Sequence, residues 1–451
     1  MDTKPLQNSA SANADADARF RGPRAARKKR IAIVTMGVKL GDETRGYTRF
    51  RFLSELLVRE GFEVELFTSS FQHWEKAQRD TSRECYRTQP YRISFIQEPG
   101  YQKNLDLARI NSHRIAARNL RAMLRERFEA DPRAFDLIYA EIPPNDVARV
   151  CAEEAHRNRI PFVADINDLW PEAMRMVVDI PVVSDVVFHP FSRDAHEVYR
   201  LLSGAVGTSD EYAARPAKDR NEPYPHVTVY VGNDLSLFDA GVKEHAGKID
   251  KPEGEVWASY AGTLGASYDL ATLVKAAAIL QERRARDLEA ASTDPGRVIA
   301  PPVRVKILGD GPDKQKLEEL AAQLDAPVDF LGYQDYPSMA AWLAKSDIVV
   351  NSLVKTAAQS IVTKIGDYLA SESPMINTGS SPEFRGKVAS DGFGVNVEAE
   401  DPEALAGAIE ELARNSSMRK IMAAKGRRIA EQQFDQPNSY RAIVDLIRKL
   451  L

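Results

Sequence analysis

The sequence is poor in the residues that mark several classes of protein. Two cysteines, Cys85 and Cys151, stand far apart in 451 residues and form no C-x-x-C pair, so we expect reduced thiols and a cytoplasmic protein. Seven histidines show no metal-ligand spacing, which predicts that neither a metal nor another cofactor is required. No uninterrupted apolar run reaches the roughly 18 residues that a membrane span needs. The net charge of −4 is small and indicates no nucleic-acid partner.

The length and the order of the apolar segments predict two domains. Residues 1–29 are rich in Ala and Asp and end in a basic run, which is typical of a disordered tail. From Arg30, an apolar strand, a glycine-containing loop, an amphipathic helix of residues 48–60 and a strand from Glu63 form a βαβ unit. Further strands are expected at residues 135–140, 161–166 and 205–208. Residues 30–235 therefore predict a doubly wound, Rossmann-like domain.

The same alternation returns in the second half of the chain. A polar stretch at residues 232–254 predicts a linker, and residues 236–434 then predict a second Rossmann-like domain. Its strands are expected at residues 257–262, 303–309, 328–332, 347–351 and 374–378. Residues 435–451 predict a C-terminal helix that returns to the first domain. The predicted fold class is α/β, with two doubly wound domains that face an interdomain cleft at the carboxyl ends of their strands.

Two glycine-containing loops in the second domain follow strands and precede helices. They contain Gly262, Thr263 and Gly265, and then Gly309 and Gly311. Glycines at such positions let backbone amides approach a phosphate, and the dipole of the following helix favours negative charge. An ordinary tight turn between a strand and a helix has the same composition, so each loop taken alone allows both interpretations.

Lys364 and Asp367 lie at the start of a predicted helix. A cation in the first turn opposes the helix dipole, and this placement is more favourable if an anion binds beside it. The alternative is a solvated Lys–Asp pair three residues apart, which contributes only a few tenths of a kcal/mol.

Two loops of the first domain also carry polar side chains after a strand. One contains Asn167 and Asp168, and the other contains His73 and Lys76. Polar groups at the carboxyl end of a strand are placed for a site in an α/β domain. Turn chemistry accounts equally for Asn and Asp in a loop, and a single loop histidine is often neither a base nor a phosphate ligand.

Basic residues are concentrated between Lys103 and Arg127, where few acidic residues accompany them. This segment contains Arg109, Arg114, Arg118, Arg121 and Arg125. Together with the Arg27–Arg30 cluster they predict a basic surface on the first domain. Such a surface is attracted to anionic lipid by about 1 kcal/mol per cation. It suits a peripheral contact with the inner face of a membrane and a lipid-linked acceptor, and the alternative is a solvated helix face.

Taken together, these segments resemble the family-4 retaining glycosyltransferases, in particular the bacterial group that builds capsule and other surface polysaccharides. The resemblance covers nearly everything from Arg30 onwards. It rests on four segments in order, Asp165–Glu172, Tyr260–Gly265, Leu308–Pro312 and Lys364–Ala370 with Pro374. It implies a GT-B fold and retaining transfer of a sugar from a nucleotide-sugar donor, a UDP-sugar, to a saccharide or polyprenyl-linked acceptor.

The resemblance also implies roles for individual residues. The family has two glutamates separated by seven residues, which fall on Gln359 and Asp367, so Asp367 is expected to bind the ribose hydroxyls and Gln359 to face the donor sugar. The donor-binding residues are then Gly262, Thr263, Gly265, Gly309, Gly311, Tyr333, Ser360, Ile361, Lys364 and Asp367. The catalytic residues are Gln359, Asp168 and His73. The acceptor-side residues are Arg49, Lys76 and Asn167.

The sequence departs from the family pattern at two places. Many members have Arg directly after the glycine of the first loop and Lys a few residues later, where this chain has Thr263 and Asp269. Lys364, together with Lys355, would then have to neutralise the leaving diphosphate. Gln359 replaces a carboxylate, which keeps an inactive partner subunit of a polysaccharide assembly complex open as an alternative.

The second alternative is a nucleotide-sugar epimerase of the same fold, which needs acid/base groups but no acceptor. A Rossmann dehydrogenase is disfavoured, because the glycine fingerprint G-x-G-x-x-G follows none of the predicted strands.

Overall fold

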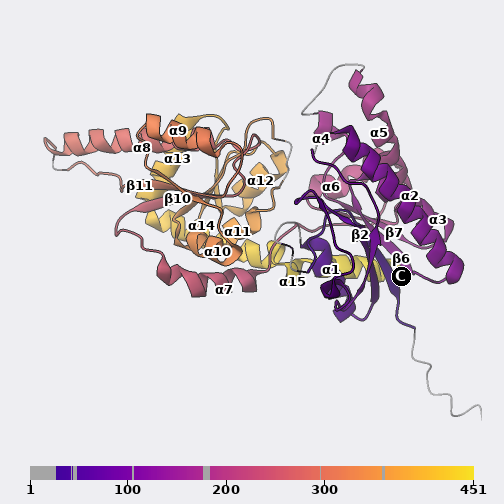
Figure 1. Ribbon diagram of the computed structural model, residues 1–451. Helices are drawn as coiled ribbons and strands as arrows, with labels where there is room; N and C mark the ends of the chain where they lie inside the picture. Colours follow the sequence, from indigo (N-terminus) through magenta and orange to yellow (C-terminus); the bar gives the residue numbers. More distant parts are fainter. Residues whose placement is uncertain are drawn as a thin grey trace, which may run out of the picture.

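The computed structural model describes residues 27–41, 43, 48–103, 106–175, 183–294, 296–357 and 361–451. It has two domains, each built on one parallel sheet between layers of helices (Figure 1). This confirms the predicted α/β class with two Rossmann-like domains. Only residues 27–29 of the predicted N-terminal tail lie among the described residues.

The first domain has a seven-stranded sheet in the order β5-β2-β1-β6-β7-β8-β9, in which all paired strands are parallel. Its strands are β1 (Arg30–Thr35), β2 (Glu63–Ser69), β5 (Arg92–Ile96), β6 (Leu137–Ile142), β7 (Phe162–Ile166), β8 (Gly204–Gly207) and β9 (His226–Thr228). The helices are α1 (Arg49–Arg59), α2 (Leu107–Ala130), α3 (Asn145–Arg157), α4 (Glu172–Arg175), α5 (Val183–Leu201) and α6 (Asp210–Ala214). A small antiparallel hairpin follows β2 and consists of β3 (Phe71–Gln72) and β4 (Ala77–Gln78).

The second domain has a six-stranded parallel sheet in the order β12-β11-β10-β13-β14-β15. Its strands are β10 (Val256–Ala261), β11 (Val303–Leu308), β12 (Val328–Gly332), β13 (Ile348–Asn351), β14 (Met375–Asn377) and β15 (Gly394–Asn396). The helices are α7 (Leu235–His245), α8 (Leu270–Ala291), α9 (Lys314–Gln323), α10 (Tyr336–Lys345), α11 (Ile365–Ala370), α12 (Pro382–Asp391), α13 (Pro402–Arg414) and α14 (Ser416–Ile429).

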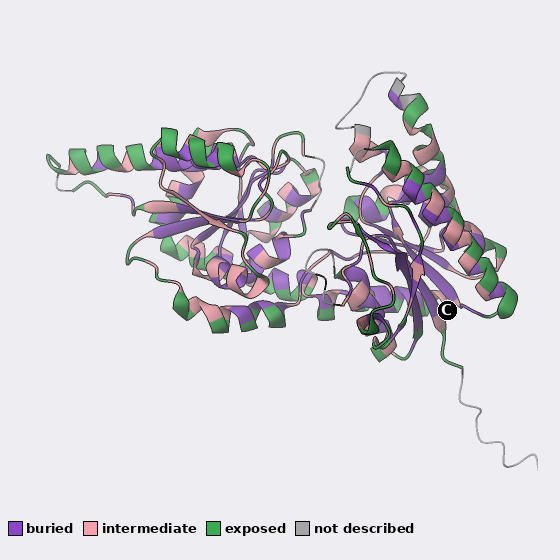
Figure 2. Ribbon diagram, viewed as in Figure 1, coloured by how far each residue is buried: buried purple, intermediate pink, exposed green. Residues whose placement is uncertain are grey.

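The central strands are buried on both faces, which is why they form continuous apolar runs. Every residue of β7 and β10 is buried, and Figure 2 shows the strands of both domains enclosed by helices whose outer faces are exposed. Parallel sheets need this double cover. The alternation of apolar strands with amphipathic helices in the sequence has the same cause.

The C-terminal segment leaves the second domain and ends on the first. A π-helical turn (Ala430–Phe434) and α15 (Gln436–Ser439) lead into α16 (Arg441–Leu450). In Figure 1 this yellow segment crosses between the two domains beside α1. Tyr440, Ile443 and Ile447 are fully buried in a core cluster whose members outside this C-terminal segment come from the first domain.

The structure differs from the sequence-based expectations at several elements. The polar stretch expected to be a linker contains α7, which packs against α10 of the second domain. Strands β5, β9 and β15 were not anticipated, because each is short and lies at an edge of its sheet. None of the helices in the described part of the chain combines the length and the apolar character that crossing a membrane requires.

Candidate functional site

Both sheets reverse their strand order beside their first strand. Strand β1 lies between β2 and β6, and β10 lies between β11 and β13. In open parallel sheets, ligands bind outside the carboxyl ends of the strands at such a reversal. A cleft of about 850 Å³ lies there between the domains. The first domain lines it with Met36 and Gly37 among others, and the second lines it with Ala266–Tyr268 and Ile361–Thr363.

The two glycine-containing loops of the second domain pack against each other. Gly262 and Gly309 have φ angles of +153° and +133°, and a Cβ on Gly309 would lie 1.8 Å from the carbonyl oxygen of Gly262. A Cβ on Gly311 would meet the Leu264 carbonyl oxygen at 2.2 Å. Only glycine fits these contacts, so both loops are held close to the carboxyl ends of β10 and β11. The glycines of these two loops are not among the residues that line the cleft. Ala266, which directly follows Gly265 in the first loop, does line it.

Lys364 lies against the first of these loops. Its Nζ donates to the Tyr260 hydroxyl over 2.8 Å and lies 4.1 Å and 3.9 Å from the ring centroids of Tyr260 and Tyr268. A Cβ on Gly262 would be only 2.5 Å from this Nζ. Burial lowers the pKa of the Lys364 ammonium well below its usual value. Among the described residues, no carboxylate forms an ion pair with it, so its charge is balanced only by aromatic faces and one hydroxyl.

Asp367 is held by two donors that sequence reasoning missed. Its Oδ1 accepts from Asn233 Nδ2 over 2.6 Å and from the Tyr336 hydroxyl over 2.8 Å. Burial raises the pKa of the Asp367 carboxyl to about 6, and both hydrogen bonds oppose that rise. Asn233 lies in the connection between the domains, so a hydrogen bond links the Asp367 carboxylate to that connection. A polar residue just before α7 gave no signal for this contact.

Of the remaining predicted donor residues in the described part of the chain, only Ile361 is among those that line the cleft. Ile361 lines it and is half-buried, while Tyr333 is 71% exposed after β12. Thr263 is exposed, and its carbonyl oxygen accepts from the Tyr260 hydroxyl over 2.7 Å. Gln359 and Ser360 lie outside the described residues.

A cationic and aromatic cluster forms the first-domain side of the cleft. His73 Nδ1 lies 2.6 Å from the Tyr101 hydroxyl and 3.4 Å from Lys76 Nζ. The Arg109 guanidinium lies 5.4 Å from the Tyr101 ring centroid and 4.7 Å from that of Trp170. Burial, with the Lys76 and Arg109 charges, lowers the pKa of His73 to about 4, so this imidazole is neutral near pH 7.

Asp168 and Asn167 follow β7 and both line the cleft. The Asp168 carboxylate accepts from the Leu169 backbone N–H over 2.9 Å and from Trp170 Nε1 over 3.1 Å. Burial raises the pKa of Asp168. The Asn167 amide donates to the Asp165 carbonyl oxygen over 3.1 Å. The loop therefore uses turn chemistry and also presents a carboxylate to the cleft.

Arg49 touches the cleft but its guanidinium is committed to the protein core. It is 1% exposed and forms a bidentate pair with fully buried Asp165, at 2.9 Å and 3.0 Å. It also donates to the Val229 and Tyr230 carbonyl oxygens and to the Tyr440 hydroxyl. These contacts join α1, the sheet, the interdomain connection and the C-terminal segment. The Arg49 guanidinium therefore belongs to a buried ion pair, and its acceptor-side role stays a prediction.

Glu141 is a cleft residue that sequence reasoning missed. It lies at the end of β6, and its Oε2 accepts from Thr35 Oγ1 over 2.5 Å and from the Met36 backbone N–H over 3.2 Å. Burial raises the pKa of this carboxyl to about 7. A charged residue near the end of an otherwise apolar strand, followed by Pro143 and Pro144, was the available signal.

No group of three or more His, Cys, Asp or Glu side chains in the described ranges is placed to hold a metal ion. The charged or titratable side chains that line the cleft instead include carboxyls with raised pKa values, a neutral histidine, and Arg109 close to aromatic rings. Such groups can bind an anionic ligand and orient polar hydroxyls without a metal.

The second domain matches a known protein family. Residues 268–415 match the model of the family described as "Glycosyl transferases group 1", and this segment includes Lys364 and Asp367. Among curated proteins, none has a sequence that matches this chain.

Solved structures similar to this chain share its two-domain architecture. Sucrose-phosphate synthase from Thermosynechococcus elongatus is 16% identical, with a TM-score of 0.65 over 94% of this chain and 99% of that chain. Anabaena HepE in complex with UDP is 15% identical, with a TM-score of 0.64 over 93% and 100%. WaaG, a glycosyltransferase involved in lipopolysaccharide biosynthesis, is 12% identical, with a TM-score of 0.58 over 92% and 99%. The fold is GT-B, and with the matched domain it indicates a glycosyltransferase.

Proposed function

We propose that the protein transfers a sugar from a UDP-sugar to a saccharide or lipid-linked acceptor with retention of the anomeric configuration. The observation that carries the proposal is the position of Lys364, whose ammonium lies beside the backbone of Gly262 at the carboxyl end of β10. A half-buried cation with a lowered pKa gains most from an anion beside it. Breaking an anomeric bond leaves negative charge on a nucleoside diphosphate, which is the anion this position suits.

The other side chains have roles that follow from their environment. Asp367, with its carboxylate held by Asn233 and Tyr336, would accept hydrogen bonds from the ribose hydroxyls. His73 is neutral near pH 7, so it would accept a hydrogen bond from a sugar hydroxyl rather than protonate the leaving group. Asp168 would orient the sugar or the acceptor from the loop after β7, and the leaving phosphate oxygen would take the acceptor proton.

Uridine is proposed as the base because a structurally similar protein, HepE, was crystallised with UDP. A role in surface polysaccharide biosynthesis is proposed from the resemblance described above and from the likeness to WaaG, which acts in lipopolysaccharide biosynthesis. In this role the protein would be cytoplasmic and meet the membrane peripherally. The apolar side chains of Leu107, Val186 and Val187, which are 80%, 72% and 52% exposed on the first domain, support such a contact.

The first test is thermal unfolding with nucleotides, with and without Mg²⁺, for the wild type and Asp367→Ala. UDP at about 100 times its Kd should stabilise the wild type by about 2.7 kcal/mol, independently of Mg²⁺, and should stabilise the variant much less. Asp250→Ala is a matched control, because Asp250 is exposed in the same domain. Absence of a shift with any nucleotide would contradict the donor site and favour an inactive partner subunit.

Product analysis then separates the remaining alternatives. The protein is incubated with UDP-sugars and extracted lipid-linked saccharides. A new glycosidic bond, with UDP released, supports transfer. An isomerised nucleotide sugar formed without acceptor would instead establish an epimerase.

A further inference from the structure

A second concave surface lies on the first domain between α2, α3 and α5. This groove has a volume of about 370 Å³ and is bordered by five arginines, Arg114, Arg118, Arg121, Arg149 and Arg193. Among the described residues, Asp146 and Asp194 are the only acidic ones that line it. The groove shares His113, Pro144 and Trp170 with the interdomain cleft, so a single ligand can occupy both.

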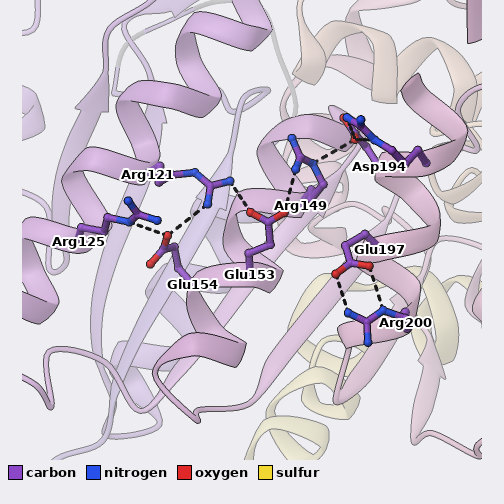
Figure 3. Close-up of polar contacts among 9 residues, drawn as sticks. Arg121, Arg125, Arg149, Glu153, Glu154, Asp194, Glu197 and Arg200 are labelled. Carbon is purple, nitrogen blue, oxygen red and sulfur yellow. Dashed lines mark hydrogen bonds and ion pairs between the residues drawn. The ribbon is translucent and has the colours of Figure 1, made fainter. Parts of the chain in front are cut away.

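The basic surface expected from the sequence is largely neutralised by neighbouring acids. Figure 3 shows Arg121 and Arg125 paired with Glu153 and Glu154, and Arg149 bridging Glu153 and Asp194. The N-terminal cluster is also paired, because Arg27 contacts Asp136 at 2.7 Å and Arg30 contacts Asp131 at 2.6 Å. A broad membrane-binding patch is therefore not what these arginines form.

Arg114 and Arg118 are the exceptions. Both are exposed on α2, and no carboxylate among the described residues forms an ion pair with either. They are four residues apart, with Arg121 three residues further on, so all three lie on one helix face and border the groove. Two adjacent cations without acidic partners repel each other, and an anion between them removes that cost. Arginine also binds phosphate through two parallel hydrogen bonds.

The floor of the groove adds a second observation. Asn145 is 1% exposed and lines the groove, and its amide donates to the Trp170 and Phe191 carbonyl oxygens over 2.8 Å and 3.0 Å. Its Oδ1 has no hydrogen-bond partner among the described residues. Buried acceptors are rarely left unpaired, so a ligand hydroxyl is a fitting donor. The apolar side chains of Ile110 and Phe191 supply the rest of the surface.

We propose that this groove binds the phosphate-bearing part of the acceptor and directs its hydroxyl past His113 and Trp170 into the cleft. The inference rests on the proposed function, because it assumes that the cleft holds the donor. The phosphate belongs to the acceptor, since the donor diphosphate is assigned to Lys364 in the other domain. Its source is either a prenyl diphosphate carrier or a phosphorylated saccharide, and both have the same anionic chemistry.

The test measures binding of three probes, geranyl diphosphate, glucose 1-phosphate and inorganic diphosphate, by calorimetry at low salt. The variant is Arg114→Ala/Arg118→Ala. The matched control is Lys275→Ala/Arg286→Ala, which removes two exposed cations from α8 of the second domain. We expect the arginine variant to lose about ten-fold or more in affinity for at least one probe, while the control binds as the wild type does. Preference for geranyl diphosphate over inorganic diphosphate indicates a lipid carrier, and preference for glucose 1-phosphate indicates a saccharide phosphate.

UDP binding is measured in parallel on the same proteins. It should be equal in the wild type, the arginine variant and the control, because neither arginine lies near Lys364 in the assigned donor site. Unchanged UDP binding with no wild-type affinity for any phosphate probe would overturn the groove and leave the proposed function intact. If the wild type does not bind UDP, the proposed function itself is contradicted. Binding of anionic lipid vesicles that depends on these arginines, without binding of any soluble probe, would overturn the acceptor site in favour of a membrane surface.

Discussion

The Nζ of Lys364 donates a 2.8 Å hydrogen bond to the hydroxyl of Tyr260, which lies near the carboxyl end of β10. The contact joins the start of α11 to the carboxyl end of the strand at which the sheet reverses its order. Strand ends and helix starts far apart in the sequence thus place one cation beside two packed glycine loops. In the proposed reaction, a cation at this position would stabilise the negative charge of the leaving diphosphate.

Replacing Lys364 by Ala should lower kcat by about 100-fold and weaken UDP binding, because the charge that develops on the leaving group loses its nearest cation. Lys355→Ala tests the other lysine that the sequence assigns to the leaving diphosphate, and it should have the smaller effect because Lys355 is exposed in the preceding loop. Steady-state kinetics with a UDP-sugar and calorimetry with UDP give the two readouts. A large loss in Lys355→Ala with a small one in Lys364→Ala would transfer the role to Lys355.

The Asp367 carboxyl should govern binding of the nucleoside near pH 6. Its raised pKa of about 6 means that the acceptor form is lost as the pH falls through that value, so affinity for uridine should weaken there. Uridine is used because it has no phosphate of its own to titrate. Tyr336→Phe removes a donor to the carboxylate, which raises the pKa further and should move the midpoint to higher pH by about half a unit to one unit.

Tyr333→Phe is the control for that experiment, because Tyr333 is exposed and gives no hydrogen bond to Asp367 among the described residues. Its midpoint should equal that of the wild type even if its affinity differs. Nuclear magnetic resonance titrations between pH 5 and pH 8 supply the affinities. A wild-type affinity that does not change across this range would show that Asp367 does not contact the ribose.

The local patterns of the sequence were enough to predict the fold class. A short window of sequence contains the information that predicts these features. Examples are the apolar strands, the amphipathic α1 and the glycine at position 262, because each depends on residues that are close in the sequence. The same reasoning failed for α7, where polar and glycine residues indicated a linker, because packing against α10 stabilises the helix.

The composition of the site was less predictable, since it depends on long-range packing. Arg49 and Asp165 are separated by 116 residues and pair only because the fold brings one residue of α1 beside one residue of β7. Glu141 lies at the end of a predicted strand, and Arg109 lies in a segment predicted to form a basic surface. The fold brings both residues to the cleft. Lys364 was singled out because a cation at a helix start is unusual, and Asp367 because it falls on a glutamate of the family pattern. The sequence did not predict that their partners would be Tyr260 and Asn233.

Glu141 should make the protein less stable as the pH rises. Its folded pKa is about 7 and its ordinary value is 4.5, so between these values the folded protein holds a proton that the unfolded chain has lost. The stabilisation is present below pH 4.5 and is lost as the pH rises through 7. Glu141→Gln has no such dependence, so the free energy of unfolding of the wild type should fall relative to this variant by about 1–3 kcal/mol between pH 5 and pH 8.

Urea denaturation at each pH measures this difference. Glu126→Gln on α2 is the control, because Glu126 is exposed and its removal should leave the pH dependence of the wild type unchanged. Parallel stability curves for the wild type and Glu141→Gln would show that the Glu141 carboxyl titrates alike in the folded and unfolded states.

Arg49 provides the sharpest separation of a structural role from a role in acceptor binding. Arg49→Met leaves Asp165 buried, and the Tyr139 hydroxyl and the Asn167 amide are then its only side-chain donors within the described ranges. This should cost about 3–5 kcal/mol of unfolding free energy. The double variant Arg49→Met/Asp165→Leu removes the uncompensated charge as well and should recover much of the loss. Arg51→Met, on the solvent side of the same helix, should change stability by less than about 1 kcal/mol. If Arg49→Met instead keeps wild-type stability in urea and raises the KM for the acceptor alone, the buried pair is dispensable and the residue belongs to the acceptor site.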